Sequence, residues 1–171
     1  MSEFQVILFV IAIVLFGITL FFIAHYNTLL RLRMSMQRSQ TDIETLLRQR
    51  HDMIVDLQTF RPAIDQQTWE EVMTLRQQLI KGSTQERIHA NDTIKGLLYP
   101  ILPRLDETEN VSLLEDLNDL EQRIMYSANV YNESVQRYND KISNSPAVAI
   151  ARLLRLKTRP SLKRVKLKRP K

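Results

Sequence analysis

The side chains that could support catalysis or bind a metal are few in this chain and poorly placed for either. Its three histidines, His25, His51 and His89, lack metal-ligand spacing, and no cysteine, His-Glu-x-x-His, Walker-type or Gly-x-Gly-x-x-Gly motif occurs. His51 and Asp52 are adjacent, but neighbours on a helix point about 100° apart, so we expect a polar helix face and no hydrogen-bonded dyad. We therefore expect no catalytic residue, no metal, no cofactor and no enzymatic activity.

Arg50 is the one charged residue at a position that the helical pattern described below assigns to the core. A buried guanidinium without a partner would cost several kcal/mol, so Arg50 needs a carboxylate. If the two long helices pair as an antiparallel bundle, Asp119 lies at the same height, and Glu115 and Glu121 lie nearby. We predict an interhelical polar cluster of Arg50, Asp119 and Glu121 that fixes the register of the helices and binds no ligand.

The C-terminal part of the chain is strongly basic. No acidic residue follows Asp140, whereas 11 of the 24 basic residues do, so residues 1–140 carry 13 basic against 19 acidic residues. Residues 147–157 predict an amphipathic helix with Arg152, Arg155 and Arg159 on one side and apolar residues largely on the other. Such a helix can lie in a membrane interface, and each basic residue near an anionic leaflet adds about 1 kcal/mol.

The side chains that we expect to bind anionic lipid are Arg152, Arg155, Lys157, Arg159, Lys163 and Arg164. Nucleic-acid binding is the rival use of so many cations. The tail has no aromatic residue for base stacking, so lipid is the favoured partner. A third interpretation is a solvated tail that only helps to orient the chain.

These features are positioned by a long apolar stretch near the start of the chain. Residues 4–26 contain no charged residue, and about 20 apolar residues of helix span a hydrocarbon core of about 30 Å. A cleavable signal peptide is the alternative, but only Met1, Ser2 and Glu3 precede the stretch, and His25-Tyr26-Asn27 is a poor cleavage site. We expect a retained single-pass anchor.

The charges beside the anchor predict its orientation. Arg31, Arg33 and Arg38 follow it before the first acidic residue, Asp42. The positive-inside rule then places the N-terminus outside and the rest of the chain in the cytoplasm, on the cell (inner) membrane. A periplasmic domain is the alternative.

Beyond the anchor the sequence predicts helices. No Gly or Pro occurs between Ile18 and Arg61, so the anchor helix should continue to about residue 60. Its inward positions are Leu29, Leu32, Met36, Ser39, Ile43, Leu46, Arg50, Met53, Leu57 and Phe60. Two short helices should cover residues 67–81, capped by Gly82, and residues 84–98. A second long helix should run from about residue 109 to 144, with Leu113, Leu117, Leu120, Ile124, Ala128, Tyr131, Val135, Tyr138 and Ile142 facing inward.

The predicted fold class is therefore all-α: an N-terminal transmembrane helix continuous with an antiparallel bundle of two long and two short helices. Residues 1–25 form the anchor, 26–145 the bundle and 146–171 the basic tail. Opposite positions on the long helices should have residue numbers that total about 169. Asn27 then faces the neighbourhood of Ile142, one turn from Tyr138-Asn139, and we expect Tyr and Asn side chains to hydrogen-bond one another in the seam, in preference to lining a ligand pocket.

The order of several short motifs resembles that of the LemA family over nearly the whole chain. These motifs are Tyr26-Asn27, Asp42-Ile43, residues 48–54 (Arg-Gln-Arg-His-Asp-Met-Ile), residues 69–72 (Trp-Glu-Glu-Val) with Arg76, Tyr99-Pro100, Glu121 with Arg123 and Ile124, Tyr131-Asn132, Tyr138-Asn139, Ile150-Ala151 and Arg159-Pro160. The resemblance implies one membrane helix and a four-helix domain without established enzymatic activity. One departure is that Arg155-Leu156 stands where the family has Gly-Phe.

The function that this organisation favours is a non-enzymatic, membrane-anchored scaffold with an unknown protein partner, a second copy of the chain being one possibility. The alternative is a membrane organiser whose tail engages anionic lipid. An enzyme and a nucleic-acid binder are the less favoured classes.

Overall fold

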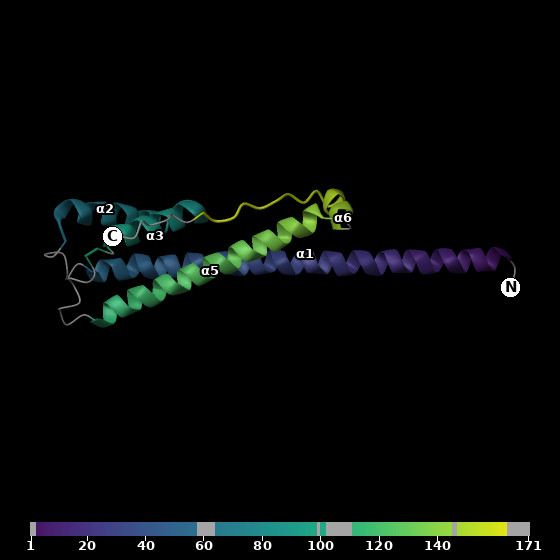
Figure 1. The fold of residues 1–171 in the computed structure, drawn as a ribbon, viewed down its shortest axis with the longest axis horizontal. Helices are drawn as coiled ribbons and strands as arrows, with labels where there is room; N and C mark the ends of the chain where they lie inside the picture. Colours follow the sequence, from purple (N-terminus) through teal and green to yellow (C-terminus); the bar gives the residue numbers. More distant parts are fainter. Residues whose placement is uncertain (1–2, 58–63, 99, 102–110, 145–146, 164–171) are drawn as a thin grey trace. The chain divides into compact units, whose positions relative to one another are not determined.

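A computed structural model describes residues 3–57, 64–98, 100–101, 111–144 and 147–163 (Figure 1). Its helices are α1 (Glu3–Asp56), α2 (Gln66–Gln78), α3 (Thr84–Leu98), α5 (Val111–Ser143) and α6 (Ala147–Leu153). Within the described residues there is no strand, so the all-α prediction is confirmed. Proline is also expected to break the helical pattern at Pro62, Pro103 and Pro146, and these three residues lie outside the described residues.

Helix α1 is one unbroken helix of 54 residues, as the absence of Gly and Pro from most of it predicts. Its first part exposes nearly every apolar side chain from Phe4 to Ile23. Burial begins at Leu29, which is 2% exposed, and then follows the predicted helical stripe. The buried positions on α1 are Leu29, Met36, Ser39, Ile43, Leu46, Leu47, Arg50 and Ile54.

The chain forms two compact units, and α1 and α5 each contribute to both. The first contains described residues between 3 and 36 and between 133 and 160. In it, the Oγ atoms of Ser35 and Ser134 lie 2.9 Å apart. The expected register sets these two positions opposite each other, so the hydrogen bond agrees with it. Val135, Tyr138 and Ile142 of α5 are buried in this unit.

The second unit contains described residues between 37 and 132 and residues 161–163. Its hydrophobic core joins α1, α2, α3 and α5, with α2 and α3 side by side. Fully buried members are Ile43, Leu47, Ile54, Leu57, Val72, Leu79, Ile88, Ala90, Ile94, Ile124 and Ala128. Every one of the four helices contributes at least one of these side chains, so the core requires all four.

Local capping fixes where the short helices begin. Asp65 caps α2 by accepting from the Thr68 N–H at 2.9 Å. The pKa of Asp65 is lowered mainly by the hydrogen bond from the Thr68 side chain and next by that from the Thr68 backbone. Ser83 and Glu86 form a capping box at α3, in which Glu86 Oε2 accepts from the Ser83 N–H and hydroxyl at 2.7 and 2.8 Å. The backbone hydrogen bond from Ser83 is the main cause that lowers the pKa of Glu86.

The expected cap of α2 by Gly82 is wrong. The helix ends at Gln78, with Leu79 as its C-cap residue. Gly82 has φ +88° in the turn that follows, and a Cβ there would lie 2.6 Å from Glu86 Oε2. The glycine is therefore needed for the capping box of α3, because a side chain would disturb its carboxylate.

The predicted amphipathic helix over residues 147–157 is also wrong, because α6 ends at Leu153. Arg155 has φ +52°, the Arg155 N–H donates to the Arg152 carbonyl at 3.1 Å, and the Leu156 N–H donates to the Ala151 carbonyl at 2.9 Å. These two bonds form a Schellman motif, which ends a helix at a left-handed residue. Arg155 and Arg159 therefore do not continue the helical face of Arg152.

The family resemblance led us to expect glycine at position 155. Glycine has no Cβ and would adopt this left-handed conformation without strain. We predict that Arg155→Gly raises the free energy of unfolding by about 0.5–1 kcal/mol, because the relief of Cβ strain exceeds the added entropy of the unfolded chain. Arg152→Gly, inside α6, should instead lower it by about 1 kcal/mol. Urea unfolding of both variants in detergent micelles checks this, and equal shifts for the two would contradict it.

Candidate functional site

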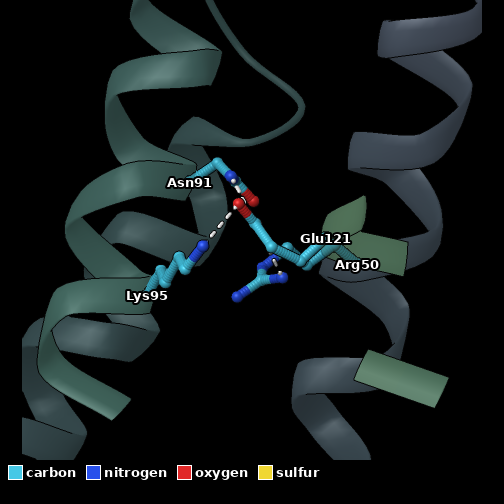
Figure 2. Close-up of polar contacts among 4 residues, drawn as sticks. All are labelled: Arg50, Asn91, Lys95 and Glu121. Carbon is cyan, nitrogen blue, oxygen red and sulfur yellow. Dashed lines mark hydrogen bonds and ion pairs between the residues drawn. The ribbon is translucent and has the colours of Figure 1, made fainter. Parts of the chain in front are cut away.

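A buried carboxylate joins three helices of the second unit. Glu121 of α5 accepts at Oε2 from Arg50 Nη1 of α1 at 3.4 Å and from Asn91 Nδ2 of α3 at 3.1 Å. Its Oε1 accepts from Lys95 Nζ of α3 at 3.0 Å, as Figure 2 shows. The side chains of Arg50 and Glu121 are 5% and 7% exposed. A low-dielectric surrounding strengthens such contacts and makes the loss of one partner costly.

Asp119, which we predicted to join this cluster, lies outside it. Its side chain is 70% exposed and forms an i,i+4 pair with Arg123 at 3.9 Å. The predicted register gave Asp119 the correct height along α5, but its side chain lies on the wrong side of the helix. Glu121 follows Leu117 by four residues and precedes Ile124 by three, so it continues the apolar stripe of α5, whereas position 119 points away from it. That spacing was the signal in the sequence.

His51 and Asp52 do form a hydrogen bond, contrary to our expectation. His51 Nδ1 lies 2.9 Å from Asp52 Oδ1, so the two side-chain ends meet although the residues leave the helix in different directions. Asp52 is 80% exposed, and the His51 carbonyl accepts from Arg76 Nε of α2 at 2.7 Å. The pair therefore lies at the contact between α1 and α2, where the guanidinium of Arg76 ties the two helices together.

An open groove of about 610 Å³ lies between α1 and α5 in the same unit. Asp42, Thr45 and Gln49 line it from α1, and Arg123 and Tyr126 are among its residues from α5. No group of three or more His, Cys, Asp or Glu side chains in the described part of the chain could hold a metal ion. The groove offers hydrogen-bonding groups from both helices, among them the Asp42 carboxylate and the Arg123 guanidinium.

Two asparagines of α5 hold the backbone of the tail. Asn139 Nδ2 donates to the Arg159 carbonyl and Asn139 Oδ1 accepts from the Arg159 N–H, both at 2.8 Å. Asn132 holds Leu162 in the same way, at 3.0 and 2.7 Å. Each carboxamide thus satisfies both backbone groups of one residue.

The spacing of the two Tyr-Asn pairs explains this arrangement. Asn132 and Asn139 are seven residues apart, and seven residues of helix rise about 10.5 Å. The residues that they hold are three apart, and three extended residues cover about 10 Å. The tail numbers rise as the α5 numbers fall, so the tail is antiparallel to α5.

The expected hydrogen bonding between Tyr and Asn side chains in the seam is therefore wrong. Asn27 is exposed, and both asparagines of α5 bind main chain. Tyr138 is buried and Tyr131 is partly buried against the core, so the tyrosines contribute packing. The repeat was visible in the sequence, but its partner was a segment without secondary structure, which periodicity does not reveal.

The residues predicted to bind lipid occupy different settings. Arg152 lies on α6, Arg155 ends it, and Lys157, Arg159 and Lys163 lie on the extended tail. The side chains of these five residues are exposed, although the backbone of Arg159 and of Lys163 is held by carboxamides. Arg164 lies outside the described residues.

We predict that Glu121→Ala lowers the free energy of unfolding by about 3–5 kcal/mol, because it leaves the cations of Arg50 and Lys95 near the core without their shared carboxylate. Asp119→Ala, two residues away and exposed, should change it by less than about 0.5 kcal/mol. Chemical unfolding followed by circular dichroism measures both. A loss for Asp119→Ala as large as that for Glu121→Ala would show that the effect is not specific to the buried cluster.

Comparison with known proteins identifies the family of the chain. A search of curated proteins finds no match. The family model described as LemA family matches residues 39–170, which covers most of the chain and begins beyond the exposed apolar part of α1. The matched range contains the Glu121 cluster and the asparagines that hold the tail. On this match, the chain belongs to the LemA family.

Proposed function

We propose that this protein is a non-enzymatic scaffold that is anchored in a membrane by the first part of α1 and binds a protein partner through its helical units. The observation that carries the proposal is the apolar surface of α1 before Leu29. The most apolar stretch of this helix is long enough to cross a membrane, and none of it is buried in the structure. Exposure of this apolar surface to water is unfavourable, whereas lipid would cover it.

The continuity of α1 supports a retained anchor over a cleaved signal sequence. The helix that exposes Phe4 to Ile23 passes without interruption into the stripe that begins at Leu29. A cut near residue 26 would separate the anchor from a helix that the core of the second unit requires.

The charges beside the apolar part support a cytoplasmic location for the helical units. Arg31, Arg33 and Arg38 are exposed on α1, where they can remain beside cytoplasmic head groups. A periplasmic location is the alternative.

The use of the buried polar groups supports a structural role in place of catalysis. Glu121 is surrounded by donors from α1 and α3, and the His51 carbonyl is bound by Arg76. Both arrangements join helices. The open groove beside Tyr126 is a polar surface of the second unit that can receive a partner, and Tyr126 itself is 71% exposed.

We predict that the full chain stays with membranes after alkaline extraction and that Ile11→Arg with Val14→Arg releases most of it. Each arginine near the bilayer centre costs about 2.5–3.5 kcal/mol on insertion scales. Gln37→Arg with Thr41→Arg, on exposed positions later in α1, is the matched control and should stay bound. Equal release of the two variants would argue against the anchor.

Two further measurements complete this test. Protease digestion of sealed vesicles of known orientation decides between a cytoplasmic and a periplasmic location. Crosslinking from native membranes, with a photoreactive residue in place of Tyr126 and the same residue in place of exposed Glu115 as the control, tests partner binding. A partner captured equally from both positions would not support binding at the groove.

Lipid engagement by the tail is the second candidate function, and the exposed cations favour it. The assay measures how strongly neutral proteoliposomes that carry the chain associate with anionic vesicles. We predict that replacing Arg152, Lys157 and Arg159 together by Gln weakens this association by on the order of 100-fold, because each cation contributes about 1 kcal/mol. Replacing Arg48, Lys81 and Arg137, which are exposed elsewhere, removes the same charge. Co-flotation measures both, and equal weakening would point to net charge instead of the tail.

A further inference from the structure

The tail residues Leu162 and Lys163 lie in a clamp made by two carboxamides of the second unit, Asn132 of α5 and Gln85 of α3. Asn132 binds both backbone groups of Leu162, at 3.0 and 2.7 Å. Gln85 Nε2 donates to the Lys163 carbonyl at 2.7 Å, and Gln85 Oε1 accepts from the Lys163 N–H at 2.8 Å. We call this pair of side chains the amide clamp.

The amide clamp holds both edges of an extended chain. In an extended segment, the backbone groups of successive residues point to opposite edges. Asn132 takes one edge at Leu162 and Gln85 takes the other at Lys163, so all four backbone groups of these residues are bonded. Side chains on surrounding helices thereby do for this segment what neighbouring strands do in a sheet.

The amide clamp selects backbone shape more than side-chain identity. Its four hydrogen bonds involve only main-chain groups of the tail. The one side chain that adds specificity is Leu162, which packs against the hydrophobic core of the unit, whereas the Lys163 side chain is exposed. The ligand that fits is therefore an extended peptide with an aliphatic side chain at the Leu162 position.

The segment in the amide clamp follows α6, which ends at Leu153, so the bound residues come from the C-terminal part of the chain rather than from an internal helix. An element of this kind can be exchanged between identical chains at low cost, because the hydrogen bonds broken within one chain form again between two chains. Anchoring in one membrane would raise the local concentration of copies and favour such exchange.

We propose that the amide clamp is a peptide-binding site that accepts the tail of a second copy of this chain in place of its own. This deepens the scaffold proposal by naming the partner, and it rests on that proposal for its biological use. The exchange itself depends only on the hydrogen bonds and packing at the clamp, so it can be tested in detergent whether or not the anchor proposal holds.

The experiment mixes two full-length variants that are each defective in a different half of the interaction. The clamp variant carries Asn132→Ala with Gln85→Ala and keeps its tail, and the tail variant carries Leu162→Asp and keeps its clamp. The chain has no cysteine, so a donor dye is placed on the tail through Thr158→Cys and an acceptor dye on α3 through His89→Cys, both exposed positions. Energy transfer between the two variants reports a tail seated on a second copy.

Two matched controls pair the clamp variant with itself and the tail variant with itself. In every pair one copy carries the donor dye on its tail and the other copy carries the acceptor dye on α3. All pairs share α1, so any association through the anchor contributes equally to every pair. We expect transfer in the mixed pair to exceed both controls at least fivefold. Equal transfer in all three pairs, with helix content by circular dichroism unchanged, would overturn the proposal.

Two additions keep the outcome clear. If Leu162→Asp lowers helix content, Leu162→Ser replaces it and the same comparison decides. A labelled peptide of residues 156–171 is also added to the tail variant, with the same peptide carrying Leu162→Asp as the control. Peptide binding together with transfer supports the proposal, whereas peptide binding without transfer between copies would overturn the second copy as the occupant.

Discussion

The second unit depends on the neutralisation of one buried charge, the carboxylate of Glu121. Apolar side chains along two long helices can interdigitate in several registers with similar energies, and a slip of one turn moves a side chain by about 5.4 Å. A buried carboxylate does not tolerate such a slip, since it would lose Arg50 from α1 together with Asn91 and Lys95 from α3. Placing these donors on two helices sets the positions of both against α5.

The tail after α6 presents the opposite problem, because residues 157–163 form a segment without regular structure. In residues 157–163, the part of the tail that the structure describes beyond α6 and its terminating turn, no backbone hydrogen bond to a helix or strand is formed, and polar main-chain groups need hydrogen bonds wherever water is excluded. Asn139, Asn132 and Gln85 supply those bonds one residue at a time. Because a carboxamide carries a donor and an acceptor in one plane, it fits the two groups of an extended residue. These three side chains therefore give the helices a surface that binds the main chain of the tail.

Helix α1 carries surfaces suited to two surroundings along one continuous element. Before Leu29 its apolar side chains are exposed on all sides, and after Leu29 they are buried on one stripe while the remaining faces stay polar. An all-round apolar surface matches lipid, and a stripe matches a helical core. The change between the two kinds of surface on α1 therefore lies near Leu29.

The sequence by itself determined the helical class, the bounds of α3 and the continuity of α1, because hydrophobic periodicity and the absence of Gly and Pro are local signals. It also showed that Arg50 requires a carboxylate. Only the tertiary structure decided that Glu121 and not Asp119 supplies it, that Arg155 ends α6 and that Asn132 and Asn139 bind the tail. These outcomes depend on which side of a helix faces a neighbour and on interactions between residues far apart in the chain, and periodicity along one segment contains neither.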